Sequence, residues 1–86
     1  MNDDRAVPKH ARKWEITETA DGIVIQNGDC IHVLNETARD IFRLCDGTRT
    51  VSEISREIMQ RYTGENIDSS VKDAISKFLE LNIIQR

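Results

Sequence analysis

Cysteine and histidine are scarce in this 86-residue chain, which has two of each, and this limits the metal and disulfide chemistry open to it. Cys30 and Cys45 lie far apart and form no CxxC pair, so they predict neither half of a zinc site nor a disulfide framework. We interpret both as reduced thiols, with Cys45 in the core, because a small buried hydrophobe is the commonest role of a lone cysteine. No metal or other cofactor is predicted.

Long apolar runs are absent as well. No stretch approaches the roughly 18 residues of a membrane span, and the polar start MNDDRAVPKHARK lacks the apolar core of a signal peptide. We therefore expect a cytoplasmic protein, folded as one domain with a modest core. The formal net charge of −3 argues against a nucleic-acid partner, because affinity for nucleic acid comes mainly from Lys and Arg that neutralise phosphates.

The chain also lacks a constellation of catalytic residues. It contains no nucleophile elbow, phosphate loop or HExxH motif, and no pair of carboxylates at a spacing that tunes one acid against another. His10 falls in a polar N-terminal segment, and His32 stands alone on a predicted strand. Asp46 is better explained as the end of a helix beside Gly47 than as a catalytic acid. We predict that the protein is not an enzyme.

Apolar and polar residues alternate between residues 14 and 34, and residues 1–13 before them predict a flexible, solvated arm. Successive strand side chains point to opposite faces, so apolar pairs two apart predict half-buried strands. Asp21-Gly22 separates the first strand from the second, and Asn27-Gly28 separates the second from the third, with Asn-Gly favouring a type I′ hairpin turn. Three short antiparallel strands in the order 1-2-3 are predicted. The apolar pairs are Trp14 and Ile16, Ile23 and Ile25, and Ile31 and Val33.

Three helices follow, because the apolar period lengthens after Asn35. Asn35 is a good N-cap for the first helix, and Asp46-Gly47 ends it, since Gly47 tolerates a left-handed conformation. Thr50 and Glu53 have the spacing of a capping box that begins a second helix, which runs to about Arg61. Asp68 or Ser69 is the expected cap of the third helix. The inward faces are predicted to carry Ala38, Ile41, Phe42 and Cys45, then Ile54, Ile58 and Tyr62, then Val71, Ala74, Ile75, Phe78 and Leu79, with Ile83 and Ile84 extending back against the fold.

A three-stranded antiparallel sheet followed by three helices predicts an α+β domain over residues 14–86 that resembles a winged helix-turn-helix. In the order 1-2-3 the third strand lies at an edge, where unpaired backbone groups form a template for another strand. Proteins usually blunt such an edge with Lys or Pro, and residues 29–34 contain neither. The third strand is therefore a candidate binding site for an extended peptide.

The central residues resemble the signature of the PqqD-like family, whose members bind the leader segments of ribosomally made precursor peptides. The resemblance covers roughly residues 14–84 and implies that this chain is a RiPP recognition element that takes up a leader peptide as an added strand. A groove against the third helix would receive the peptide's side chains, and a modifying enzyme of the radical SAM/SPASM type would be the other partner. The positions that carry the resemblance are Leu34, Asn35, Thr37, Ala38, Ile41, Leu44, Cys45, Asp46, Gly47, Thr50, Glu53 and Ile54, then Tyr62, Val71, Asp73, Phe78, Leu79 and Leu81.

Carried over to this chain, the resemblance implies two groups of peptide-binding residues. The backbone of the third strand would bond the peptide, and the flank of the third helix nearest an apolar groove would contact alternate side chains. Ile75 and Leu79 are equally explained as core residues. The residues of the predicted site are Asp29, Cys30, Ile31, His32, Val33 and Leu34 on the strand, with Lys72, Ile75, Ser76 and Leu79 on the helix.

Two further questions stay open in the sequence. The backbone N–H and C=O groups of Ile31 and Val33 point to one side of the strand, and those of His32 point to the other. We expect the groups of His32 to face outward, toward the peptide.

Two other functions fit the same elements: a winged helix that binds DNA or RNA, and an adaptor that pairs its edge strand with a second copy, so that the protein is a monomer or an edge-strand dimer. The third helix has too few basic residues for the first alternative.

Overall fold

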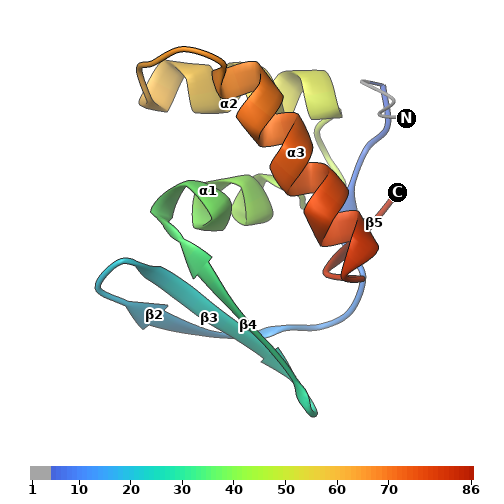
Figure 1. Ribbon diagram of the computed structural model, residues 1–86. Helices are drawn as coiled ribbons and strands as arrows, with labels where there is room; N and C mark the ends of the chain where they lie inside the picture. The colour runs from blue at the N-terminus through green and yellow to red at the C-terminus, as the bar shows by residue number, and fades with distance from the viewer. Residues whose placement is uncertain (1–4) are drawn as a thin grey trace.

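Three helices lie on one side of a small antiparallel sheet in the computed structural model, which describes residues 5–86 (Figure 1). The sheet has the order β2-β3-β4, and a separate two-stranded pair joins β1 to β5. The predicted α+β class is confirmed, with a three-stranded antiparallel sheet and three helices. The order of elements differs from the prediction, because two short strands, one near each end of the chain, were not predicted. The winged-helix arrangement stays a prediction. The elements are β1 (Lys9–His10), β2 (Glu15–Thr19), β3 (Gly22–Asn27), β4 (Cys30–Asn35), α1 (Glu36–Leu44), α2 (Val51–Arg61), α3 (Ile67–Glu80) and β5 (Ile84–Gln85).

The turn between β3 and β4 differs from the predicted type I′ turn. Its two central residues are Gly28 and Asp29, because Asn27 is still in β3 and pairs with Cys30. Gly28 has φ +60°, whereas Asp29 has no positive φ. A positive φ at the first central position alone is the pattern of a type II′ turn, which favours glycine there. The hairpin forms as predicted, but one residue later in the sequence.

The register decides which face each strand residue occupies. Ile25 pairs with Ile16 on one side and His32 on the other, and Ile25 is fully buried, so this row faces the helices. Val33 pairs with Val24 in the neighbouring row and is 76% exposed, so it points to the outer face of the sheet. The expectation that Ile31 and Val33 form the half-buried face of their strand is therefore wrong. Leu34 and His32 take the inward phase instead.

The caps of the first two helices follow the predicted chemistry. The side chain of Asn35 accepts a hydrogen bond from the amide of Ala38, and Thr50 and Glu53 form the reciprocal bonds of a capping box. The third helix begins earlier than predicted, at Ile67, after Asn66 in a left-handed conformation that makes no side-chain cap bond. Asp68, a predicted cap of α3, instead accepts a hydrogen bond from Ser55 of α2.

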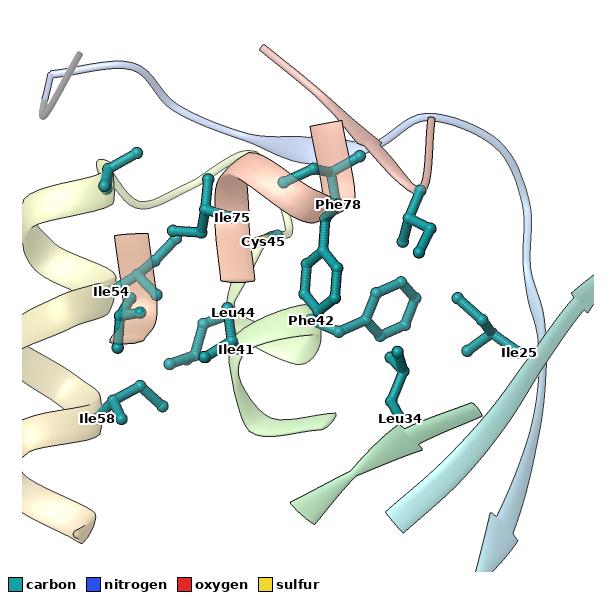
Figure 2. Packing of buried hydrophobic residues seen from close by; sticks show 14 of the residues in the cluster. Ile25, Leu34, Ile41, Phe42, Leu44, Cys45, Ile54, Ile58, Ile75 and Phe78 are labelled. Atoms are coloured by element: carbon teal, nitrogen blue, oxygen red, sulfur yellow. The ribbon is translucent and has the colours of Figure 1, made fainter. Parts of the chain in front are cut away.

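The core lies between the helices and the inner face of the sheet. Figure 2 shows Phe42 of α1 and Phe78 of α3 together beside Ile25 and Leu34 of the sheet. The two rings meet edge to face, with centroids 6.5 Å apart. Most predicted inward residues are buried, and Ala38, Tyr62, Ala74 and Leu79 are half-buried around them. Ile83 and Ile84 are buried as expected, which brings the C-terminal segment back to the fold.

The N-terminal segment packs on the domain, so the expected solvated arm does not describe residues 5–13. The carbonyl oxygen of Ala6 accepts a hydrogen bond of 2.9 Å from the amide of Val51, the first residue of α2. Pro8 is fully buried, and its carbonyl oxygen accepts from the amide of Gly47 at 3.0 Å. The segment thereby supplies acceptors to amides at a helix start and a turn. The remainder of the predicted arm, residues 1–4, lies outside the described residues.

His10 attaches the same segment to the core. Its ring stacks on the ring of Phe42 with centroids 4.0 Å apart, and its Nε2 donates a hydrogen bond of 2.9 Å to the carbonyl oxygen of Phe42. Beside it, β1 pairs with β5, and the amide of Ala11 donates to the carbonyl oxygen of Ile83. Chain segments from the two ends of the sequence thus cover one end of the core together.

Removal of residues 1–11 is expected to lower the free energy of unfolding by about 2 to 4 kcal/mol, measured by urea denaturation. The truncation uncovers Phe42 and leaves β5 without its partner, while the conformational entropy regained by the chain offsets part of the loss. Lys9→Ala is the matched control, because it removes an exposed side chain and keeps the backbone pairing, and should change stability by less than about 0.5 kcal/mol. A truncated protein as stable as the full chain would restore the interpretation of residues 5–13 as an arm.

A buried carboxylate connects α1 with the end of α2. The hydroxyl of Tyr62 donates to Oδ2 of Asp40 at 2.6 Å, and Nε of Arg39 donates to Oδ1 at 3.1 Å. Burial raises the pKa of Asp40, but these two hydrogen bonds outweigh burial, so the pKa lies below the ordinary value of 3.8. Asp40 is therefore an ionised structural group and not a free acid.

Candidate functional site

As the alternation predicts, β4 is an edge strand: among residues 5–86 its only strand partner is β3. The loop that joins the two strands has two residues, so Asn27 and Cys30 form the pair that closes the hairpin. The residues beside such a loop exchange both of their backbone hydrogen bonds, and hydrogen-bonded and non-bonded pairs then alternate along an antiparallel ladder. The register of the hairpin therefore fixes which backbone groups of β4 are directed away from β3.

Counting along the ladder from the turn gives the two phases of β4. Cys30, His32 and Leu34 direct their N–H and C=O groups to β3, where their partners lie. Ile31 and Val33 direct theirs to the free edge. The expectation that His32 has the outward phase is wrong, because the two-residue loop is centred one residue later than the sequence indicated.

The free edge of β4 lacks the Lys and Pro residues that often block strand addition. Ile31 is 57% exposed and Val33 is 76% exposed. Asp29 is exposed in the turn at one end of the strand, and the exposed thiol of Cys30 lies 3.8 Å from the guanidinium of Arg12.

On the inward side of β4, His32 contacts Trp14 and Leu34 packs in the core. His32 is half-buried, and its ring meets the ring of Trp14 edge to face with centroids 5.7 Å apart. Trp14 is held in turn, because its indole N–H donates to the carbonyl oxygen of Ile83 at 3.0 Å. Leu34 is buried in the core and is a structural residue. Of the inward residues of β4, His32 is the one with a partly accessible side chain near the middle of the strand.

Three of the residues predicted on the third helix, Lys72, Ser76 and Leu79, are half-buried. Asp68 of α3 hydrogen-bonds with Ser55 of α2, and Lys72 forms an ion pair of 3.2 Å with Asp68. Ser76 and Leu79 follow Lys72 by four and seven residues and share its flank. Figure 1 shows α1 between α2 and the sheet, with α3 running from the level of α2 down toward the end of the sheet. The role of this flank in peptide binding stays a prediction.

Ile75 belongs to the core, with 3% of its surface exposed, so the alternative of a core residue holds for it. The opposite flank of α3 carries Ala74 and Lys77, with Leu81 next at the C-cap and 42% exposed.

Asp46 and Cys45, two titratable groups between α1 and α2, have structural roles. Asp46 accepts from the hydroxyl and amide of Thr48 and pairs with Arg49, and the hydrogen bond from the Thr48 hydroxyl is the main cause of its lowered pKa. Burial raises the pKa of the Cys45 thiol to about 12, so Cys45 is a protonated core residue as predicted. No three His, Cys, Asp or Glu side chains in the described part of the chain gather where they could hold a metal ion.

Two hollows on the surface lie away from β4. One, lined by polar side chains, follows α2 from Arg49 to Gln60. The other lies at the α2–α3 connection between Met59 and Asp68, where Met59 is 46% exposed. The β4 edge carries the apolar side chains of Ile31 and Val33 on its outer face. Residues 14–34 hold four acidic and no basic residues, and Glu18 among them pairs with Arg43.

The family model described as coenzyme PQQ synthesis protein D (PqqD) matches residues 22–84. The chain belongs to this family. The match spans β3 to β5 and therefore includes the whole β4 edge and all three helices, while β1 and β2 precede it. The predicted resemblance is confirmed, and PqqD membership supports a binding role in the biosynthesis of a peptide-derived product.

Neither a curated protein nor a solved structure matches the chain. No helix between residues 5 and 86 has the length and apolar character needed to cross a membrane.

Proposed function

We propose that this PqqD-family protein is a non-catalytic carrier that binds the leader segment of a ribosomally made precursor peptide and presents it to a modifying enzyme. The observation that carries the proposal is the free edge of β4, where the backbone groups of Ile31 and Val33 point away from the sheet. Strand addition to such an edge gives affinity through main-chain hydrogen bonds. The family match spans this edge, which supports the same mechanism.

The absence of a catalytic role belongs to this proposal. In the described residues, the ionised Asp40 is hydrogen-bonded within the fold, the Cys45 thiol is buried and protonated, and the ring of His10 is fixed on Phe42. Such groups stabilise the domain and leave no activated nucleophile or poised acid. The modifying enzyme, of the radical SAM type in this proposal, would supply the chemistry.

Two alternatives are weaker on specific grounds. A nucleic-acid complex needs several basic side chains on one surface, but Lys72 is paired with Asp68 and Arg61 with Glu57. An adaptor that pairs β4 with β4 of a second copy uses the same free groups, so it competes with peptide binding. Sedimentation with and without peptide separates this alternative, because a dimer through β4 should dissociate when the peptide binds.

Isothermal titration with the precursor peptide encoded beside the gene of this protein tests the proposal. We expect one peptide per protein, a dissociation constant in the submicromolar to micromolar range (about 8 to 10 kcal/mol) and no turnover of the peptide. The scrambled peptide is the control for nonspecific binding. A flat titration, with the protein alone and with its partner enzyme present, would exclude the proposed function.

A further inference from the structure

The outer face of the sheet carries exposed apolar side chains at the β4 edge, Ile31 and Val33. Thr17, Val24 and Val33 form one cross-strand row, and this row runs from β2 over β3 to the free edge. Val24 is half-buried, whereas Val33 at the free edge is 76% exposed. Val33 therefore offers apolar surface to a neighbouring strand. The next position in the row lies beyond the edge, where an added strand would place a side chain.

A second row ends at the same edge. Glu15, Gln26 and Ile31 pair across the three strands, and Ile31 is 57% exposed. Ile31 and Val33 also have the backbone phase that points outward, so residues of an added antiparallel strand would lie directly opposite them. Directly opposite side chains on one face interact, and apolar and β-branched pairs are favourable there.

We propose that the β4 edge selects peptides with apolar residues, β-branched or aromatic, at two positions two apart, both on the outer face of the extended sheet. One of these residues packs on Val33 and the other on Ile31, while the residue between them points inward beside His32. The inference rests on the proposed function and adds to it the side-chain pattern of the bound segment.

Charge restricts the two outer positions further. Near β4, Glu18 pairs with Arg43 and Arg12 lies beside Cys30, whereas the outer side chains Ile31 and Val33 are uncharged. A carboxylate on the peptide opposite Ile31 or Val33 would be desolvated against apolar side chains, which is unfavourable. Peptides with Asp or Glu at either outer position should therefore bind worst.

Selection from a display library of short random peptides tests the pattern even before the precursor peptide is identified. We expect enrichment of sequences with apolar residues at alternate positions and depletion of Asp and Glu there. The best peptide is then titrated into Val33→Thr and Ile31→Thr, which keep β-branching but remove apolar surface. Each change should weaken binding by roughly two- to fivefold, and the double variant by roughly tenfold, with unchanged thermal unfolding.

Ile16→Thr is the matched control, because Ile16 is 47% exposed on β2 at the other edge of the sheet and should not affect binding. Enriched peptides without the alternating pattern would overturn the inference. Wild-type affinity in both threonine variants would also overturn the inference. If Val33→Pro still lost binding in that case, strand addition would remain supported without the proposed side-chain pattern. No enrichment, together with a flat titration of the precursor peptide, would overturn both.

Discussion

Val33→Pro should weaken peptide binding at least tenfold while the protein keeps its thermal midpoint to within a few degrees. Proline removes the N–H of residue 33, which points to the free edge, and its ring occupies space that an added strand needs. The β3 ladder loses no hydrogen bond, and proline is tolerated on edge strands where its nitrogen faces away from the sheet. Binding should weaken at least tenfold, roughly the loss of one backbone hydrogen bond plus an unpaired acceptor on the peptide.

His32→Pro should have the opposite effect. The N–H of His32 is directed to β3, where Ile25 is its partner, so proline breaks the ladder in the middle of the sheet. We expect a loss of about 3 kcal/mol or more, enough to unfold much of the population. His32→Ala separates the backbone effect from the side chain, because it keeps the N–H and removes only the contact with Trp14.

Thermal unfolding by circular dichroism and titration of the peptide into each variant give the required pair of measurements. If both proline variants unfold equally, β4 is not an edge in solution. If both fold and bind peptide normally, the ligand lies elsewhere on the protein. Val33→Thr keeps the N–H and serves as the control for the side chain of residue 33.

Phe42→Ala should cost about 3 to 5 kcal/mol, a large part of the total stability of so small a domain. The ring of Phe42 is fully buried, stacks on His10 at 4.0 Å and meets Phe78 edge to face. Its removal leaves a cavity where the N-terminal segment, α1 and α3 meet. Phe78→Ala and Ile54→Ala, at two other buried positions, should cost roughly 2 to 5 kcal/mol each.

Urea denaturation measures these losses, with Met59→Ala as a control at an exposed apolar position on α2. The control should stay within about 1 kcal/mol of the wild type. Peptide binding should be lost in the core variants only as a consequence of unfolding, so stabilising additives should restore it. A Phe42→Ala protein that melts like the wild type would mean that the inward face of α1 is wrongly assigned.

Local chemistry made the elements predictable. The caps at Asn35 and at Thr50 with Glu53 involve residues three apart in the chain, and the sequence alone gives their partners. The hairpins follow from alternation and glycine, although a shift of one residue in the second turn exchanged the faces and phases of β4. A shift this small lies within what turn chemistry leaves open, because Asn27-Gly28 and Gly28-Asp29 both suit a two-residue loop.

The sequence by itself determined the class of fold, the edge position of the third strand of the sheet and the PqqD resemblance, since these depend on short-range periods and spacings. Only the tertiary structure decided that Asp68 bonds to Ser55 instead of capping α3, which phase of β4 is free and how residues 5–13 are held. Each of these depends on contacts between residues far apart in the chain, such as Ser55 with Asp68 and His10 with Phe42. Such contacts leave no period in the sequence, because they are set by how whole elements pack and not by the neighbours of one residue.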